Sequence, residues 1–551
     1  MEAFRNWMFL GLLILGTTAW AQQGHDHALT DEEVGSVHFV TTCGGAGSQG
    51  DASDFDSQFN QGVALLHSFE YERARGAFEA LREKNPRCAM VEWGIAMSHY
   101  HGLWANGDMA AGRAAIERAR ELANANATSE REKGYIEALG EVYGRDARDK
   151  AAKEQAFEKK MGELAAANLT DTEAAIFHAL SLAITAPKMD KTFANQRECG
   201  QILEPIFKAQ PHHPGVAHYI IHCYDNPVLA EQGLGAARMY AKIAPASAHA
   251  NHMPSHIFTR VGSWEESIAS NRRSAELAAA AERESRNGEA RDQRLHAMDY
   301  LEYAYLQSGQ VKRARAVLDE VKALKPIPGL TLTGNYATAA IPARYAIELG
   351  NWDEASRIEP LKDGVPWAQA IVWEAIGEGS ARTGKLERAA EAEERLADLR
   401  DASAKTTVYW SKQVEVERLE VGGWIAVERG KKEEAVAMMR SAAELEESMD
   451  KDAVTPGPVT PGRELLARVL MEQGKQKEAL EEYEAVLKVA PKRFNAIYGA
   501  GVAADASGNN PLANKYFQEL LEIARSEERA EVTTAKTKLG ETPQGPSAAK
   551  R

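Results

Sequence analysis

The sequence predicts an all-α protein in which pairs of antiparallel helices stack side by side as a solenoid. The composition favours helix over sheet, because Ala, Glu, Arg and Leu are abundant and aromatic residues make up only 7% of the 551 residues. Small and aromatic residues also recur at fixed offsets along the chain, and no stretch has the alternating pattern of strands. We therefore expect repeated helical units, each burying its apolar face against its neighbours.

Two segments carry the repeat most clearly. Each has a small residue, a second small residue 12 positions later, an aromatic residue after 4 more and a proline after 8 more; these are Gly62, Ala74, Phe78 and Pro86, and Ala467, Ala479, Tyr483 and Pro491. This spacing resembles the tetratricopeptide repeat, a helix–turn–helix unit of about 34 residues. The resemblance implies that small residues let two helices approach, that the aromatic ring fills the gap, and that proline ends the second helix. It also implies a concave groove lined by the first helices of successive units.

The predicted organisation follows composition changes and repeat boundaries along the chain. It comprises a signal peptide at residues 1–21, a flexible Gly-rich leader at 22–54, an N-terminal solenoid with a histidine-rich groove at 55–326, a middle block of helix pairs at 327–455, a C-terminal repeat pair at 456–527 and a disordered tail at 528–551. The signal peptide rests on a short apolar run that is followed by an A-x-A cleavage pattern ending at Ala21. We therefore expect a periplasmic or secreted protein without a membrane span in the mature chain.

Charge and cysteine content narrow the function further. The net charge of −15 argues against nucleic-acid binding, which depends on clustered Lys and Arg. An exported chain meets an oxidising compartment, so its four cysteines can form disulfides. They allow three full pairings, among which the sequence does not choose, and free buried thiols are the other reading; the four are Cys43, Cys88, Cys199 and Cys223.

Histidines concentrate in one part of the repeat array. The 45 residues from His212 to His256 contain seven of the 15 histidines in the chain. When the units are aligned on the repeat, many of them fall on one face of the first helix of a unit, at spacings of three and four. The five that align best are His218, His222, His249, His252 and His256, and the same face includes His178, Arg260, His296, Asp299, Tyr303, His67 and His101. We expect all of these side chains to line the concave groove.

The five aligned histidines are the candidate metal ligands. Neutral imidazole is the commonest protein ligand for transition metals, and an all-imidazole site suits zinc or copper. His218 with His222, and His252 with His256, stand four residues apart, so each pair can chelate one ion from a single helix turn. We expect the two pairs to face one groove and to share one ion or one small ligand, for which they can supply four ligands. Oriented rings need hydrogen-bond partners, and Asp225 and Asn251 are the candidates for that role. The arrangement does not match the H-E-x-x-H motif of metalloproteases.

Other readings of the histidines stay open. Packed core rings are one, an anion site that also uses Arg260 is another, and histidines that act as a general acid or base are a third. Pro254 adds a structural alternative, since a helix that begins there places His249 outside the register of His252 and His256.

A closer resemblance covers about 60 residues. The stretches "HPGVAHYIIHCYDNP" and "HANHMPSHIFTRVGSWEESIASN" are similar to those of exported bacterial proteins with tetratricopeptide repeats, a group that implies no particular reaction. Two function classes follow from the sequence. The first is a binding or scaffold protein whose groove holds a peptide, a protein partner, a small ligand or a metal ion. The second is a zinc- or copper-dependent enzyme that uses His218, His222, His252 and His256.

Overall fold

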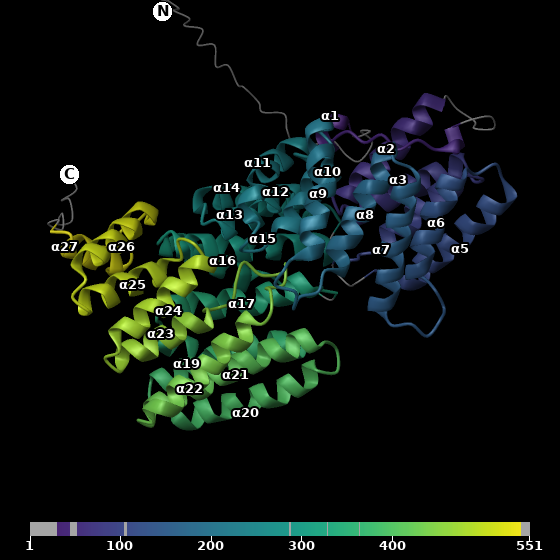
Figure 1. Ribbon diagram of the computed structural model, residues 1–551. Coiled ribbons are helices and arrows are strands. Elements are labelled where there is room, and N and C mark those ends of the chain that lie inside the picture. The colour runs from purple at the N-terminus through teal and green to yellow at the C-terminus, as the bar shows by residue number, and fades with distance from the viewer. Residues whose placement is uncertain are drawn as a thin grey trace, which may run out of the picture.

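The computed structural model describes residues 30–44, 52–103, 107–285, 288–327, 329–362 and 364–540. Within these ranges every regular element is a helix and there is no strand, which confirms the predicted fold class. Successive helices pack in antiparallel pairs, and the chain runs from the N-terminal helices through a central group to the middle and C-terminal helices (Figure 1). The predicted signal peptide lies outside the described residues.

The helices fall into three consecutive groups. The N-terminal group contains α1 (Asp31–Val34), η1 (Thr42–Gly44), α2 (Ala52–His67), α3 (Tyr71–Lys84), α4 (Ala89–His99), α5 (Met109–Ala125), α6 (Glu130–Val142), α7 (Lys150–Ala167), α8 (Thr172–Thr185), α9 (Ala194–Ala209) and α10 (Pro214–Tyr224). The central group contains η2 (Ala230–Gly233), α11 (Leu234–Ile243), α12 (Ala248–His252), α13 (Pro254–Arg260), α14 (Trp264–Ser285), α15 (Gly288–Gln307), α16 (Val311–Ala323) and α17 (Leu332–Glu348). The last group contains α18 (Trp352–Ala355), α19 (Pro366–Arg382), α20 (Leu386–Ser403), α21 (Val408–Glu428), α22 (Lys432–Glu447), α23 (Gly462–Glu472), α24 (Gln476–Val489), α25 (Phe494–Ala506), α26 (Asn510–Ile523) and α27 (Ala530–Lys538).

The packing inside a unit explains the recurring small and aromatic residues. The ring of Phe78 lies so close to Gly62 and Gly94 that a Cβ atom added to either glycine would approach it within 2.8 and 2.6 Å. Gly501 stands in the same relation to Phe517, at 2.7 Å. Glycine at these positions therefore lets the helix backbones close around a buried ring. A larger side chain would force them apart, because interiors are packed as densely as crystals.

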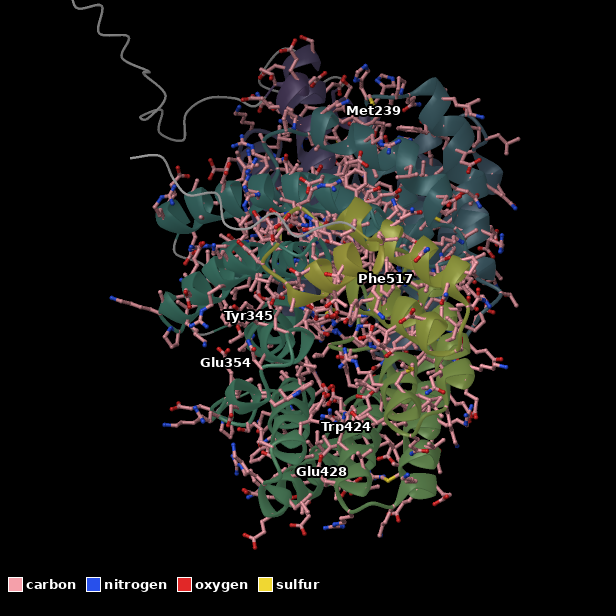
Figure 2. The ribbon with its side chains drawn as sticks, turned by 90° about the vertical axis from the view of Figure 1, so that its left-hand side faces the viewer. Met239, Tyr345, Glu354, Trp424, Glu428 and Phe517 are labelled. Carbon is pink, nitrogen blue, oxygen red and sulfur yellow. A yellow bond between two sulfur atoms is a disulfide. The ribbon has the colours of Figure 1, made fainter. Side chains whose placement is uncertain are left out.

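The chain curls back on itself. The C-terminal repeats return to the central helices, where Trp264 Nε1 donates to the carbonyl of Lys492 (3.1 Å) and the backbone N–H of Phe494 donates to the side chain of Gln307 (2.9 Å). Figure 2 shows the yellow C-terminal helices with Phe517 over the middle of the molecule, with the green helices around Trp424 below them. Two apolar cores result, one ending at Phe258 and the other beginning at Trp264. The predicted boundary at residue 326 does not coincide with this division.

Two predictions about the ends of the chain need correction. Residues 30–44 of the leader are not a free linker, because Val34 and Phe39 are buried in the N-terminal core. The tail is helical over α27, which buries Val532 and Ala535, so a disordered tail from residue 528 is wrong for these residues; 541–551 lie outside the described part. In both cases a few apolar side chains in a polar segment provide enough burial to order it.

All four cysteines are paired. Cys43 joins Cys88 at the start of α4, and Cys199 on α9 joins Cys223 on α10. The second disulfide is next to His222 in the sequence and ties α10, which carries two of the candidate ligands, to its neighbour.

We expect the double variant Cys199→Ser with Cys223→Ser to lose about 3 kcal/mol of stability, the chain-entropy value for a loop of this size. Cys199 and Cys223 are 24 residues apart in the sequence. Urea denaturation of the oxidised protein and the variant measures the loss. Equal denaturation midpoints for the two proteins would show that the bridge does not stabilise the fold.

Candidate metal centre

Three neighbouring helices and one distant helix carry the histidine cluster. His218 and His222 lie on α10, His249 and His252 on α12, and His256 on α13. Ser247 begins α12, since its hydroxyl accepts from the N–H of Ala250 (3.1 Å). Pro254 then starts α13, where its missing N–H costs little. The sixth ring, His296, comes from α15.

The six rings form two triads. In triad 1, His218, His222 and His249 each offer a nitrogen, and the three nitrogens lie within 4.8 Å of one another. In triad 2 the same holds for His252, His256 and His296. Five of the six rings are buried, and His222 is partly exposed. The four histidines expected to share one site are therefore divided between two sites.

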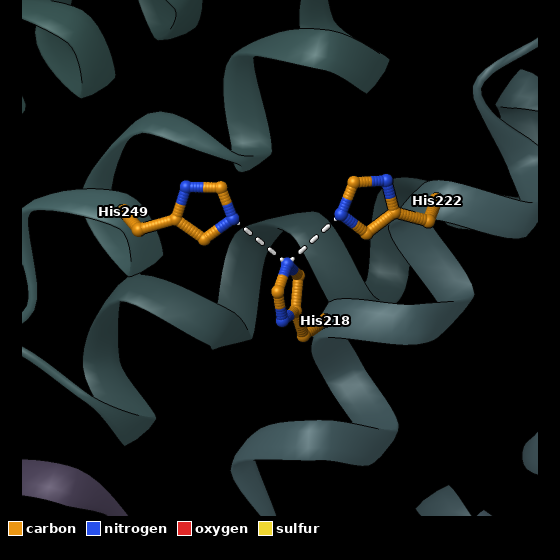
Figure 3. Close-up of side chains that lie close together, drawn as sticks. All are labelled: His218, His222 and His249. Carbon is orange, nitrogen blue, oxygen red and sulfur yellow. Dashed lines mark hydrogen bonds between the residues drawn. The ribbon is translucent and has the colours of Figure 1, made fainter. Parts of the chain in front are cut away.

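His218 is the centre of triad 1. Its Nε2 lies 3.0 Å from Nε2 of His222 and 3.0 Å from Nε2 of His249, as Figure 3 shows. Its Nδ1 donates to the backbone carbonyl of His67 at 2.6 Å, so its Nε2 carries the lone pair. The Nε2 atoms of His222 and His249 thus both approach a single acceptor nitrogen. This arrangement suits three nitrogens that share one ligand better than it suits a set of hydrogen bonds.

In triad 2, hydrogen bonds determine which ring nitrogens of His252 and His256 carry the protons. Nδ1 of His252 donates to Oδ1 of Asn271 (2.7 Å), whose own N–H₂ group donates to the carbonyl of Ser267. Nδ1 of His256 donates to Oδ2 of Asp225 (2.8 Å). Both Nε2 atoms therefore carry lone pairs, and they face each other at 3.0 Å. Two facing lone pairs repel unless a cation lies between them.

A proton is a poor candidate for that cation. Burial lowers the pKa of every ring in the two triads, and neighbouring imidazoles lower most of them further; the pKa of His222 falls to about 3, and those of His218, His249, His252 and His296 lie well below the usual value. The rings are therefore neutral at pH 7, the form that binds metals. In addition, Nδ1 of His296 has no hydrogen-bond partner among the described residues.

Asp225 anchors the polar side of triad 2. Besides His256 it accepts from Nε of Arg260 (2.8 Å) and from Nζ of Lys451 (3.0 Å). Burial alone would raise its pKa, but Lys451 and Arg260 more than offset this and hold it well below the usual range. Burial also lowers the pKa of Lys451 to about 8. The predicted role of Asp225 in orienting a ring thus agrees with its position.

Several residues that were predicted to orient a ring or to line the groove have other contacts. Asn251 orients no ring, since its amide donates to the carbonyls of Pro245 and Ser247. Asp299 pairs with the buried Arg344, whose guanidinium also lies over the ring of Tyr303 (5.5 Å). Asp299 and Tyr303 therefore belong to a buried ion-pair network around Arg344.

The three remaining histidines of the predicted groove also lie outside both triads. His178 packs against α7 at Gly162, and His101 stacks on Tyr71 at 4.0 Å between ring centroids. His67 bonds through Nε2 to Glu173 (2.9 Å) and through Nδ1 to the hydroxyl of Tyr219 (2.9 Å). Both of its nitrogens are satisfied, so its contribution to triad 1 is the carbonyl that orients His218.

Sequence reasoning missed two parts of the centre. Asn271 belongs to α14, whose residues do not line the groove in the repeat frame; it ends the second stretch of the closer resemblance, but no role was predicted for it. The segment 450–454, expected as the end of the middle block of helix pairs, covers the histidines instead and is held there by hydrogen bonds from Tyr300 to the carbonyls of Ala453 and Thr455. Only the tertiary structure brings these residues to the site.

Comparison with known proteins identifies the repeat. The family model of the tetratricopeptide repeat matches residues 59–127 and 465–528. The chain contains tetratricopeptide repeats in these two segments. The matched segments lie on either side of the histidine cluster in the sequence, and both triads come from the region between them.

The other comparisons with known proteins do not assign a function to the chain. The solved structure of the APC/C hetero-tetramer Cut9–Hcn1 is similar over 88% of this chain and 90% of that chain, at 12% identity and a TM-score of 0.32. No curated protein matches the chain. No helix in the described ranges combines the length and the apolar character that crossing a bilayer requires.

Proposed function

We propose that this tetratricopeptide repeat protein binds two transition-metal ions, one in each histidine triad. The observation that carries the proposal is the pair of Nε2 lone pairs of His252 and His256, which face each other at 3.0 Å while both Nδ1 atoms donate to fixed acceptors. Hydrogen bonds from Nδ1 to carbonyl, amide and carboxylate oxygens are the usual support of metal-ligating imidazoles. An all-imidazole set suits zinc or copper.

Export of the protein is part of the proposal. Disulfides persist in oxidising compartments such as the periplasm, and both cysteine pairs are formed here. Together with the predicted cleavage after Ala21, they support a periplasmic or secreted location. Metal loading would then occur outside the cytoplasm, on the folded chain.

Titration of the metal-free, untagged protein tests the proposal. We expect two equivalents of zinc or copper to bind by calorimetry, and one equivalent to be lost in each of the variants His218→Ala and His252→Ala. His178→Ala is the matched control, because its ring lies outside both triads. Absence of binding in the wild-type protein would refute the proposal.

Removing a partner that orients a ligand should weaken one site alone. We expect Asn271→Ala to reduce the metal affinity of triad 2 by about 10- to 100-fold, because His252 loses the acceptor that fixes its ring. Triad 1 should keep its affinity. Asn126→Ala, which removes an amide bonded to the end of α5, is the control for a general loss of stability. Equal weakening of both sites would contradict this role for Asn271.

A scaffold function is the second candidate. The matched repeats favour it, since repeat solenoids present extended surfaces on which partners bind. The space beside the histidines does not fit a peptide, however, because segment 450–454 of the same chain covers it. A protein partner would therefore bind another surface of the solenoid, and both functions can coexist.

A further inference from the structure

The two triads lie against each other. The ring centroids of His222 and His256 are 6.3 Å apart, and those of His249 and His252 are 6.4 Å apart. The widest separation inside triad 1, between His222 and His249, is also 6.4 Å. The gap between the triads is thus no larger than a gap within one, and the six rings form a single cluster.

We infer, building on the proposed function, that the two triads form one dinuclear copper centre whose cuprous ions bind a dioxygen molecule between them. Three protein ligands leave an open position on each ion, as in catalytic metal sites. Ions held in adjacent triads can share one bridging ligand, as paired metals do in two-metal enzymes.

Charge selects copper over other metals. All six ligands are neutral, so two zinc ions would bring four positive charges into a buried cluster, whereas two cuprous ions bring two. Asp225, the carboxylate bonded to His256, already pairs with Arg260 and Lys451, so its charge does not compensate a further cation. Uncompensated buried charge is costly, so the pair of lower charge is favoured. Imidazole also suits copper, and Cu²⁺ stands highest in the affinity order of divalent ions.

A cavity of about 180 Å³ gives access to both triads. Its wall includes His222 and His249 of triad 1 and His256 and His296 of triad 2, together with Lys451 and Val454 of the covering segment. Sites for drug-sized ligands measure about 300–1,000 Å³, so this one fits a smaller molecule. Dioxygen is small enough for this cavity. Its reduction by two electrons needs both ions, because each supplies one electron.

The binding step is balanced without another reactant. Each Cu⁺ gives one electron to dioxygen, which becomes a peroxide bridging two Cu²⁺ ions. Two copper–oxygen interactions form, the O–O double bond becomes a single bond, and no proton or leaving group is involved. The reverse transfer releases dioxygen and restores the cuprous pair.

The experiment loads the untagged protein with Cu⁺ under anaerobic conditions and then admits oxygen. We expect two copper ions per chain, uptake of one dioxygen per two coppers, and a new charge-transfer absorption. Most of the copper should give no electron paramagnetic resonance signal after oxidation, because two bridged Cu²⁺ ions couple their spins. His249→Ala should retain a single copper in triad 2, take up no oxygen and, after oxidation, give the full signal of one isolated ion. His178→Ala should behave like the wild-type protein.

The outcomes separate this inference from the proposed function. If the wild-type protein binds no metal, both fail. If it binds two coppers that take up no oxygen and show two independent spins after chemical oxidation, the metal sites stand and the dinuclear centre is refuted. Binding of zinc with exclusion of copper refutes the dinuclear copper centre in the same way. These readouts use the wild-type protein, so a variant that fails to fold does not affect the decision.

Discussion

We expect zinc or copper added to the metal-free protein to raise its melting temperature. A ligand that binds only the folded chain stabilises it by about 4 kcal/mol per site when its free concentration is 1,000-fold above the dissociation constant. With two sites, this is the largest effect that the structure predicts. The folded protein becomes more stable because the bound metal ion removes the repulsion between facing lone pairs, such as those of His252 and His256 at 3.0 Å. Thermal denaturation followed by circular dichroism, with and without metal, measures the shift.

A double variant provides the control. His218→Ala combined with His252→Ala removes one ligand from each triad, and we expect it to remain helical and to show no metal-dependent shift. His178→Ala should keep the full shift, because that ring contacts neither triad. A shift that survives the double change would place the metal elsewhere on the chain.

Arg493→Met should cost about 3–5 kcal/mol, the usual loss when one partner of a buried ion pair is removed. The guanidinium is fully buried and pairs with Glu464 (2.5 Å) and Glu348 (2.5 Å), linking the C-terminal repeats to α17. Glu464 keeps a second partner in Arg468, so Glu348 becomes the carboxylate without a compensating charge. Urea denaturation gives the loss in free energy of unfolding.

Two further variants distinguish charge from packing. Arg118→Met removes an exposed guanidinium paired with Glu121, and such surface pairs contribute about 0–1 kcal/mol. Adding Glu348→Gln to Arg493→Met should recover part of the loss, because the amide needs no countercharge. A double variant as unstable as Arg493→Met alone would assign the loss to packing instead.

The sequence predicted the fold because the repeat is a local pattern. Gly62, Phe78 and Pro86 lie within one unit, and their spacing determines how its two helices meet. The ends of the chain were predicted less well. Val34 and Val532 each belong to a small group of apolar residues in a polar segment, and only their neighbours in space show that they are buried.

The candidate centre could be predicted in part. The four-residue spacing of His218 with His222, and of His252 with His256, depends on one helix turn and appears in the sequence. Their division between two triads, with His249 and His252 of the same helix α12 in different triads, appears only in the tertiary structure. His296 was expected only as a groove residue, because α15 approaches the cluster through tertiary packing.

Anomalous X-ray diffraction from crystals of the untagged protein, saturated with copper or zinc, tests the central claim most directly. We expect two peaks in the anomalous difference map, one surrounded by His218, His222 and His249 and the other by His252, His256 and His296. For zinc, the ring nitrogens should lie about 2.0–2.1 Å from each peak. A map from metal-saturated crystals with no peak at either triad would contradict the account.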